Sequence, residues 1–325
     1  MKAAWYERNG PARDVLTVGD VDTPEPAAGE VRVKLAASGV NPSDVKGRMG
    51  RPLPGQMVIP HSDGAGVIDA VGAGVTHDRI NERVWIWNGQ WKRQHGTAAE
   101  YICLPAHQAA RLPGNVDFAA GACLGIPALT AVQAVAHMGQ VGGKTLLVTG
   151  AGSAVGHYIV QIARHRGARV IGTASDQRAQ HARAAGADFV VDYKHKDVTE
   201  VVKHMTRNEG VDGIIDMDLS STANLIADAI VKPHGTIVCY GSNVPGDIPI
   251  SFPAMLWNSY TLKVFLVYEL TVGERTAAIA ELTKMLEGGK LKHAVGARFP
   301  LRDIVAAHEA VEKGAVSGNV VLDIG

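Results

Sequence analysis

The second half of the chain alternates short apolar runs with amphipathic stretches and glycines. Residues 145–149 read Thr-Leu-Leu-Val-Thr, and Val155, Ile159 and Ile162 then recur at helical spacing until Gly167 can end the helix. Further apolar runs of strand length stand at 169–173, 189–191, 214–216, 236–240 and 261–266. This rhythm predicts a parallel, doubly wound sheet of about six strands, which binds ligands at the carboxyl ends of its strands.

The first part of the chain has a different pattern of short strands broken by turns. Residues 32–36 follow Pro24, Pro26 and Gly29, and residues 64–68 precede Gly72, which predicts a β-rich domain. Helices are expected at 275–286 and 303–313 and a last strand at 320–324, and we expect this tail to rejoin the first domain. The 325 residues exceed the usual size of one hydrophobic core, which favours two domains.

Composition excludes several classes of function. The 32 basic and 32 acidic residues cancel, so no overall field would draw the protein to nucleic acid or to an anionic membrane. The charged residues Lys2, Glu7 and Arg8 argue against a signal peptide, and no apolar run approaches membrane-spanning length. We therefore expect a cytoplasmic protein. The separate cysteines, Cys103, Cys123 and Cys239, are expected to be buried free thiols.

A glycine-rich turn joins the first strand and helix of the α/β region. It reads Thr-Gly-Ala-Gly-Ser-Ala-Val-Gly over 149–156, with the last two glycines one residue further apart than in the strict dinucleotide fingerprint. Glycines let the backbone approach a pyrophosphate, and helix N-terminal amides donate to phosphate oxygens. The alternative is that the glycines serve only helix packing. The expected cofactor contacts are Gly150, Gly152, Ser153, Ala154, Val155 and Gly156.

The end of the second strand decides between the two nicotinamide cofactors. An acidic residue there would bind a ribose 2′-hydroxyl and repel a 2′-phosphate, but this chain has Ala174. Ser175 and Arg178 follow and offer a hydroxyl and a guanidinium to a 2′-phosphate. NADPH is therefore favoured over NADH. The alternative for Arg178 is an ordinary solvated helix residue.

Segments 38–44, 61–68, 99–101 and 125–131, with the glycine turn, together resemble the zinc-independent quinone oxidoreductases of the medium-chain dehydrogenase/reductase superfamily, the group that includes zeta-crystallin. The resemblance covers essentially the whole chain. It implies a GroES-like catalytic domain at 1–122 and 268–325, a Rossmann NADPH-binding domain at 123–267, and a cofactor cleft between them. It also implies a homodimer formed by edge strands around residues 260–267.

The same resemblance argues against a metal. In the zinc-dependent alcohol dehydrogenases of this superfamily, the zinc ligands stand at the positions of Asn41, Ser62 and Ile126, and none of these residues replaces its ligand. His61 lies one residue from a ligand position, but no thiolate accompanies it. The structural zinc loop needs four cysteines and the chain has three. We therefore expect no metal.

Without zinc, side chains must polarise the carbonyl of the acceptor. The resemblance places Asn41, Asp44, Lys46 and Thr130 around the nicotinamide, where an amide, an ammonium and a hydroxyl can donate hydrogen bonds to developing negative charge. The family often has tyrosine at Lys46, which leaves a substrate or cofactor contact and a solvated lysine as equal alternatives. Asn41 can instead be a turn residue before Pro42, and Thr130 can bond its own helix backbone.

Further cofactor contacts rest on the resemblance alone. They are Tyr193 after the third strand, Ser220 or Ser221 in the loop after Asp216, Gly241 and Ser242, the segment with Phe265 and Val267, and Asn319 in place of a basic residue. The segment 84–96 contains three tryptophans, which either shape the substrate mouth or pack a strand edge.

These observations predict an NADPH-dependent oxidoreductase that transfers hydride to a quinone or another α,β-unsaturated carbonyl. The protein supplies alignment and the cofactor supplies the chemistry. An alcohol dehydrogenase is a second possibility, which the absent zinc ligands disfavour. A non-catalytic NADPH-binding protein, crystallin-like or RNA-binding, is a third, which the net charge of zero does not support.

Overall fold

The computed structural model describes residues 1–325 apart from the side chain of Asp176. The chain divides into two compact units. The first unit comprises Met1–Ile126 together with Ile279–Gly325, and the second comprises Pro127–Ala278. The chain thus leaves the first unit, builds the whole of the second, and returns.

The second unit contains one six-stranded parallel sheet in the order β10-β9-β8-β11-β12-β13. The sequence order reverses between β8 and β11, which is the topological switch point where doubly wound sheets bind ligands. The predicted α/β fold is therefore confirmed for this unit. Its strands are β8 Thr145–Val148, β9 Arg169–Ala174, β10 Phe189–Asp192, β11 Val211–Asp216, β12 Val231–Cys239 and β13 Thr261–Val264.

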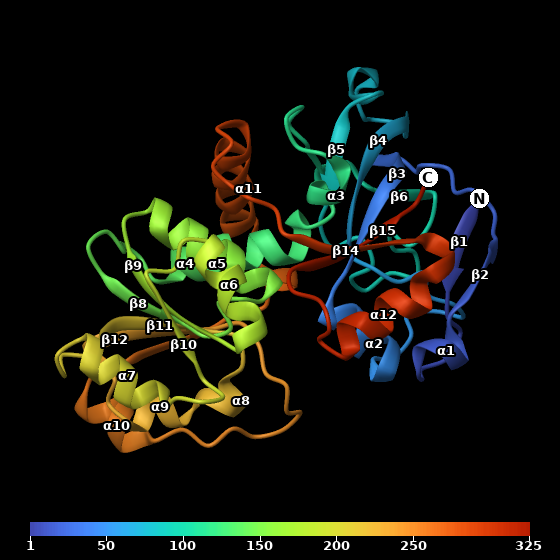
Figure 1. Ribbon diagram of the computed structural model, residues 1–325. Helices are drawn as coiled ribbons and strands as arrows, with labels where there is room; N and C mark the ends of the chain where they lie inside the picture. The colour runs from blue at the N-terminus through green and yellow to red at the C-terminus, as the bar shows by residue number, and fades with distance from the viewer. The chain divides into compact units, whose positions relative to one another are not determined.

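Helices cover both faces of this sheet. Figure 1 shows α4 (Leu129–His137), α5 (Ala154–His165) and α6 (Asp176–Ala184) on one face. The other face carries α7 (Val198–Met205), α8 (Leu219–Thr222), α9 (Asn224–Ala227) and α10 (Phe252–Trp257). Helix α5 buries Ile159 and Ile162, as the apolar pattern predicts, whereas Val155 is only half-buried. A short 3-10 turn, Val267–Glu269, follows β13 and precedes α11 (Val272–Glu287).

The first unit is built on a seven-stranded sheet in the order β14-β15-β3-β4-β5-β7, with β6 also paired to β3. Along β3, Val31, Val33 and Leu35 point into the core while Arg32 and Lys34 alternate with them. The final strand, β15, pairs with β3 near the start of the chain. The strands are β1 Lys2–Trp5, β2 Thr17–Asp20, β3 Glu30–Val40, β4 Asp63–Val71, β5 Arg83–Ile86, β6 Tyr101–Pro105, β7 Ala109–Arg111, β14 Val295–Pro300 and β15 Asn319–Asp323.

Short helices complete the first unit: α1 (Ala12–Val15), α2 (Pro42–Gly50), α3 (Phe118–Gly121) and α12 (Ile304–Glu312). Asn41 and Asp44 form a capping box that begins α2, because the side chain of each accepts a hydrogen bond from the main-chain amide of the other. Within the described chain, no helix is both long enough and apolar enough to cross a membrane.

The tryptophan-rich segment is mostly part of the core. Trp85 is fully buried in β5, and only 9% of Trp87 is exposed. Trp91 is half-buried, and the guanidinium of Arg51 lies 5.1 Å from the centre of its ring. For Trp85 and Trp87 the structure therefore favours packing over a role at a substrate mouth. Cys123 and Cys239 are buried free thiols as expected, whereas Cys103 is only half-buried because it lies on the less covered face of β6.

Candidate functional site

A cavity of about 430 Å³ opens in the second unit at the carboxyl ends of its parallel strands. Residues that directly follow β8, β9, β10 and β11 line it, and Asn243 from the segment beyond β12 joins them, as the topology predicts. The lining residues are Thr149, Gly150, Gly152, Ser153, Thr173, Ala174, Ser175, Arg178, Tyr193, Lys196, Asp197, Val198, Thr199, Met217, Asp218, Ser221, Thr222, Asn224, Leu225 and Asn243.

The glycine turn forms one wall of the cavity and leaves no room for side chains. A Cβ atom on Gly156 would lie 2.1 Å from the carbonyl oxygen of Gly150, and one on Gly152 would lie 2.6 Å from that of Arg178. Gly150 itself has a φ of 62°, a conformation that favours glycine. The Ser153 hydroxyl accepts a hydrogen bond of 3.0 Å from the Gly156 amide and begins α5. The first-turn amides of α5 therefore point to where an anion would bind.

Two cations line the cavity. Arg178 belongs to α6, directly after Ala174 and Ser175 at the end of β9. Lys196 lies beyond β10, three residues after Tyr193, and both of these residues line the same cavity. The sequence reasoning missed Lys196, for which the only signal was a basic stretch just past the third strand. A guanidinium and an ammonium in the wall of the cavity favour a ligand that carries negative charge.

A buried polar network supports the turn. The Thr149 hydroxyl donates to Asp216 over 2.6 Å and accepts from the Met217 amide over 2.9 Å. Thr222 donates to the other oxygen of Asp216 over 2.8 Å. Burial raises the pKa of Asp216 from its ordinary value, although the two hydroxyls favour its ionised form. The network ties the end of β8 to the end of β11 and holds the cavity floor in place.

Ser220 lies in a different setting from the one expected. The sequence suggested a loop after Asp216, but residues Leu219–Thr222 form helix α8. The Ser220 hydroxyl donates to Asp218 over 2.5 Å, while Ser221 lines the cavity. Burial opposes the charge on Asp218, but hydroxyl and amide donors from Ser220 and Asn243 outweigh it and lower the pKa of that carboxyl. Asp218 organises this part of the wall as an acceptor.

A second group of polar residues is buried in the first unit, at the start of α2. The Asn41 amide nitrogen of the main chain donates to Asp44 over 2.8 Å, and its side-chain nitrogen donates to Asp63 over 2.9 Å. Asp63 also accepts from the Ile126 amide over 3.0 Å. Asp63 is fully buried, and Asn41 and Asp44 are 6% exposed.

Burial dominates the ionisation of both carboxyls. It raises the pKa of Asp44 to about 7, although the amides of Asn41 and Ser62 favour the charged form. It raises the pKa of Asp63 well above its ordinary value, and the neighbouring Asp44 adds to this shift. Burial and the neighbouring Asp44 carboxyl therefore both favour the protonated form of Asp63. The sequence reasoning missed Asp63, whose signal was a lone acidic residue opening an apolar, glycine-rich strand.

Comparison with known proteins places this geometry in a family. Residues 27–114 match the family model for the alcohol dehydrogenase GroES-like domain, and residues 154–286 match that for zinc-binding dehydrogenases. The quinone oxidoreductase of Pongo abelii is 32% identical over 98% of this chain and 95% of its own length. The human quinone oxidoreductase is 31% identical over the same shares. The chain belongs to the quinone oxidoreductases of the medium-chain dehydrogenase/reductase superfamily.

Solved structures in this superfamily have the same fold. An NAD-dependent alcohol dehydrogenase is 31% identical with a TM-score of 0.88, and each chain is fully covered. A mycobacterial protein solved in complex with NADPH is 27% identical with a TM-score of 0.85, again with full coverage of both chains. The expected combination of GroES-like and Rossmann-type folds is therefore confirmed.

Asp63 contacts two of the three positions that the family resemblance equates with zinc ligands. The three positions compared with zinc ligands are Asn41 and Ile126, both hydrogen-bonded to Asp63, and Ser62, its neighbour in sequence. His61 is fully buried and bonds Ser38 through Nδ1 over 2.9 Å. Among the described residues no group of three or more histidine, cysteine, aspartate or glutamate side chains could hold a metal ion.

The remaining predicted residues have varied environments, and their roles stay predictions. Lys46 is exposed on α2, and Thr130 is buried in α4. The other predicted cofactor residues lie outside the lining of the cavity. Ala154, Val155 and Gly156 form the first turn of α5, Gly241 and Ser242 follow β12, Phe265 follows β13, Val267 is buried in the 3-10 turn, and Asn319 of the first unit donates to the Ala294 carbonyl over 3.1 Å.

Proposed function

We propose that this protein is an NADPH-dependent oxidoreductase that transfers hydride to a quinone or another α,β-unsaturated carbonyl without zinc. The observation that carries the proposal is the cavity at the carboxyl ends of the parallel sheet, walled by the glycine turn and supplied with Arg178 and Lys196. Membership of the quinone oxidoreductases and the NADPH bound by a relative of the same fold support it. The domain bounds proposed for it are 1–122 with 268–325, and 123–267.

NADPH fits this cavity better than NADH does. The glycine turn would hold the pyrophosphate against the α5 amides, and Ser175, Arg178 and Lys196 would hold the 2′-phosphate. Ala174 introduces no carboxylate that would repel this phosphate. When bound, NADPH supplies the hydride, and the chain's own residues supply binding and orientation.

Asn41 is proposed as the donor to the oxygen of the acceptor. Its side-chain nitrogen carries two hydrogens and uses one of them on Asp63. Such a donor stabilises the negative charge that the acceptor oxygen gains, and removal of one comparable donor costs other enzymes about 100- to 1000-fold in kcat. The same residue supports the proposed zinc independence, because by the family resemblance Asn41 stands where a zinc enzyme has a thiolate. Asp44, Lys46 and Thr130 remain further candidates.

A cofactor titration tests the nucleotide site. NADPH and NADH binding is measured by nucleotide fluorescence for the parent, Arg178→Ala and Arg183→Ala, an exposed residue of the same helix outside the cavity. Loss of charge-assisted bonds worth about 1.5–3 kcal/mol raises the NADPH Kd of Arg178→Ala roughly 10- to 150-fold, with NADH binding and the control unchanged. Equal affinity of the parent for both cofactors would refute the NADPH preference.

Turnover decides the reaction. Oxidation of NADPH is followed by absorbance with a panel of quinones and a panel of enones, and the zinc content of the purified protein is measured alongside. Turnover with either panel at a negligible zinc content supports the proposal. Absence of turnover with both panels would remove the enzymatic function.

An alcohol dehydrogenase is the second candidate. Besides the NAD-dependent structure already described, the alcohol dehydrogenase of a Moraxella strain is 30% identical over 99% of both chains. Oxidation of alcohols with about one zinc ion per chain would favour it. Oxidation of alcohols by the zinc-free protein would instead show that this protein acts on alcohols without needing the metal.

We also propose a homodimer formed through the edge strand β13. Val264 is 68% exposed and Leu266 is 47% exposed, so the free edge of the parallel sheet carries apolar side chains. Light scattering after size-exclusion chromatography is expected to give the dimer mass for the parent and the monomer mass for Val264→Lys. A monomeric parent would refute this assembly.

A further inference from the structure

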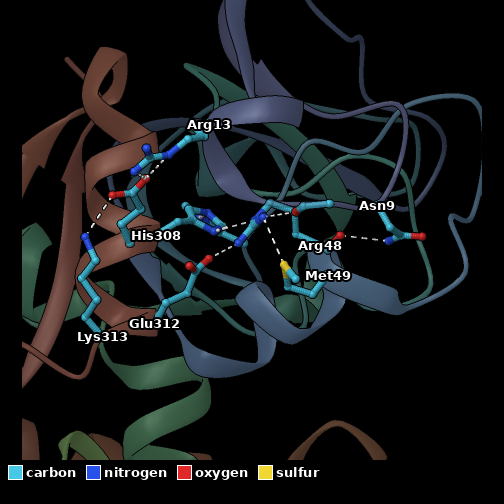
Figure 2. Close-up of polar contacts among 10 residues, drawn as sticks. Asn9, Arg13, Arg48, Met49, His308, Glu312 and Lys313 are labelled. Carbon is cyan, nitrogen blue, oxygen red and sulfur yellow. Dashed lines mark hydrogen bonds and ion pairs between the residues drawn. The ribbon is translucent and has the colours of Figure 1, made fainter.

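A buried chain of hydrogen bonds crosses the first unit between Arg48 and Asp63. Arg48 is fully buried and forms an ion pair with Glu312 of α12. Its Nε donates to Nδ1 of His308, also on α12, over 3.4 Å. Figure 2 shows Arg48 between His308 and Glu312, so one guanidinium links α2 to α12.

The direction of each bond in this chain follows from chemistry. A guanidinium only donates, so Nδ1 of His308 accepts and its Nε2 carries the proton. His308 therefore donates to Nε2 of His61 over 2.9 Å, and Nδ1 of His61 donates to the Ser38 hydroxyl over 2.9 Å. Burial keeps both rings neutral, because it lowers the pKa of His308 to about 3 and that of His61 well below its ordinary value.

The chain ends at the backbone of Asp63. Ser38 donates to the Thr97 hydroxyl over 2.8 Å, and Thr97 donates to the main-chain carbonyl of Asp63 over 2.6 Å. All of Ser38, Thr97 and Asp63 are fully buried. Each group between Arg48 and the Asp63 carbonyl both accepts and donates, so loss of one link leaves its neighbours without their partners in the interior.

The Asp63 side chain is fixed as tightly as its backbone. Oδ2 accepts hydrogen bonds from the Asn41 side-chain nitrogen and the Ile126 amide, and these two bonds use both lone pairs of a carbonyl-like oxygen. Oδ1 is buried, and the described residues give it no hydrogen-bond partner. A Cβ atom on Gly125 would lie 2.3 Å from Oδ1, so only glycine fits beside it.

We propose that Asp63 is a positioning residue that orients the side-chain amide of Asn41 toward the acceptor. The hydrogen-bond chain that begins at Arg48 and runs through His308, His61, Ser38 and Thr97 holds Asp63 in place. The inference rests on the proposed function, in which Asn41 is the donor. One N–H of Asn41 is committed to Asp63, which fixes the direction of the other. Preorganised donors of this kind stabilise the transition state without reorganising during the reaction.

A double-mutant cycle tests this inference. Kinetic constants with NADPH and a quinone are measured for Asn41→Ala, Asp63→Ala, the double variant and Asp63→Asn. We expect Asn41→Ala to lower kcat by roughly 100-fold with little change in KM, Asp63→Ala to lose roughly 10- to 100-fold, and the double variant to be no slower than Asn41→Ala. Asp63→Asn is expected to stay within about threefold of the parent, because its carbonyl oxygen can accept the same two bonds.

Thr97→Val is a second test that spares both site residues. It removes the hydroxyl that bonds Asp63 at nearly constant volume, so it is usable even if Asp63→Ala fails to fold. We expect a loss of roughly 3- to 10-fold in kcat in the parent and no further loss in the Asn41→Ala background. NADPH affinity, which reports on the second unit, is expected to change less than about twofold in every variant.

The outcomes separate the inference from the proposed function. Multiplicative losses in either double variant, an Asp63→Asn variant as slow as Asp63→Ala, or an Asn41→Ala variant with the kcat of the parent would each overturn the inference. In all of those cases the parent still reduces the quinone. A parent that binds NADPH but reduces no acceptor would overturn the proposed function itself.

Discussion

Alanine at position 156 tests whether close backbone approach holds the nucleotide turn together. The added Cβ would lie 2.1 Å from the Gly150 oxygen and 2.8 Å from the Cα of Ala151, and both neighbours are backbone atoms. Overpacking of this kind costs about 1–3 kcal/mol. The Gly150 oxygen also accepts the Ser153 amide over 2.8 Å, and a displacement of that oxygen adds about 1 kcal/mol. We expect a total loss of roughly 2–4 kcal/mol in the free energy of unfolding.

Thermal unfolding and nucleotide binding measure the effect of Gly156→Ala. The expected fall in Tm is roughly 5–15 °C, and the NADPH Kd rises at least about 10-fold because the α5 amides shift away from the pyrophosphate. Gly273→Ala is the matched control, since Gly273 lies in the exposed first turn of α11 with no atom within 4 Å of the added Cβ. A Gly156→Ala protein with the Tm and Kd of the parent would refute the reasoning.

Three further predictions concern buried polar groups. Thr149→Val removes a donor to Asp216 and an acceptor for the Met217 amide, and should lower the free energy of unfolding in urea by about 2–4 kcal/mol; a loss below about 0.5 kcal/mol would contradict it. His308 stays neutral in the folded protein but binds a proton in the unfolded chain between about pH 6.5 and 3. The free energy of unfolding of the parent should therefore fall by about 1.4 kcal/mol per pH unit relative to that of His308→Gln as pH falls through that range; parallel stability curves would contradict it. The pH dependence that Asp44 causes has the opposite sign, since the pKa of Asp44 in the folded protein is about 7. Relative to Asp44→Asn, the free energy of unfolding of the parent should fall by roughly 4 kcal/mol as pH rises from about 4 to 7, and a constant difference would rule this out.

The parallel sheet could be predicted from the sequence because its strands are continuous apolar runs. Strands buried on both faces have no polar interruptions, and the glycine turn marked where the first one ends. The start of β12 was missed, since Lys232, Pro233 and His234 interrupt the run between Val231 and Thr236. Those residues belong to the strand only through the irregular pairing of its first residue with β11.

The cavity was predicted where residues follow strands and was missed where they come from elsewhere. Ser175, Arg178 and Tyr193 stand directly after β9 and β10, so position in the sequence was enough. To place Lys196 in the cavity, one must know the path of the chain beyond β10. To place Ser220, one must know that residues Leu219–Thr222 form α8. Neither path has a local signature strong enough to read from the sequence.

The buried histidine pair could not be predicted from any local pattern. His61 and His308 are 247 residues apart and each looks like an isolated histidine in an apolar segment. Only the pairing of β15 with β3 and the placement of α12 bring them together. Asp63 was missed for the same reason, because its partners Asn41, Thr97 and Ile126 come from separate segments.

The position of β15 between β14 and β3 has a consequence for synthesis of the protein. Val40 pairs with Val320, so the Ala37–Val40 end of β3 waits for 280 residues of further translation before its partner exists, whereas Glu30–Lys34 pair with β6 much earlier. The second unit is contiguous, and it can therefore finish its sheet on the ribosome while the first unit remains open. During that interval the unpaired edge of β3 is exposed to other chains. Slow translation or a shortage of chaperones should therefore damage the first unit before the second.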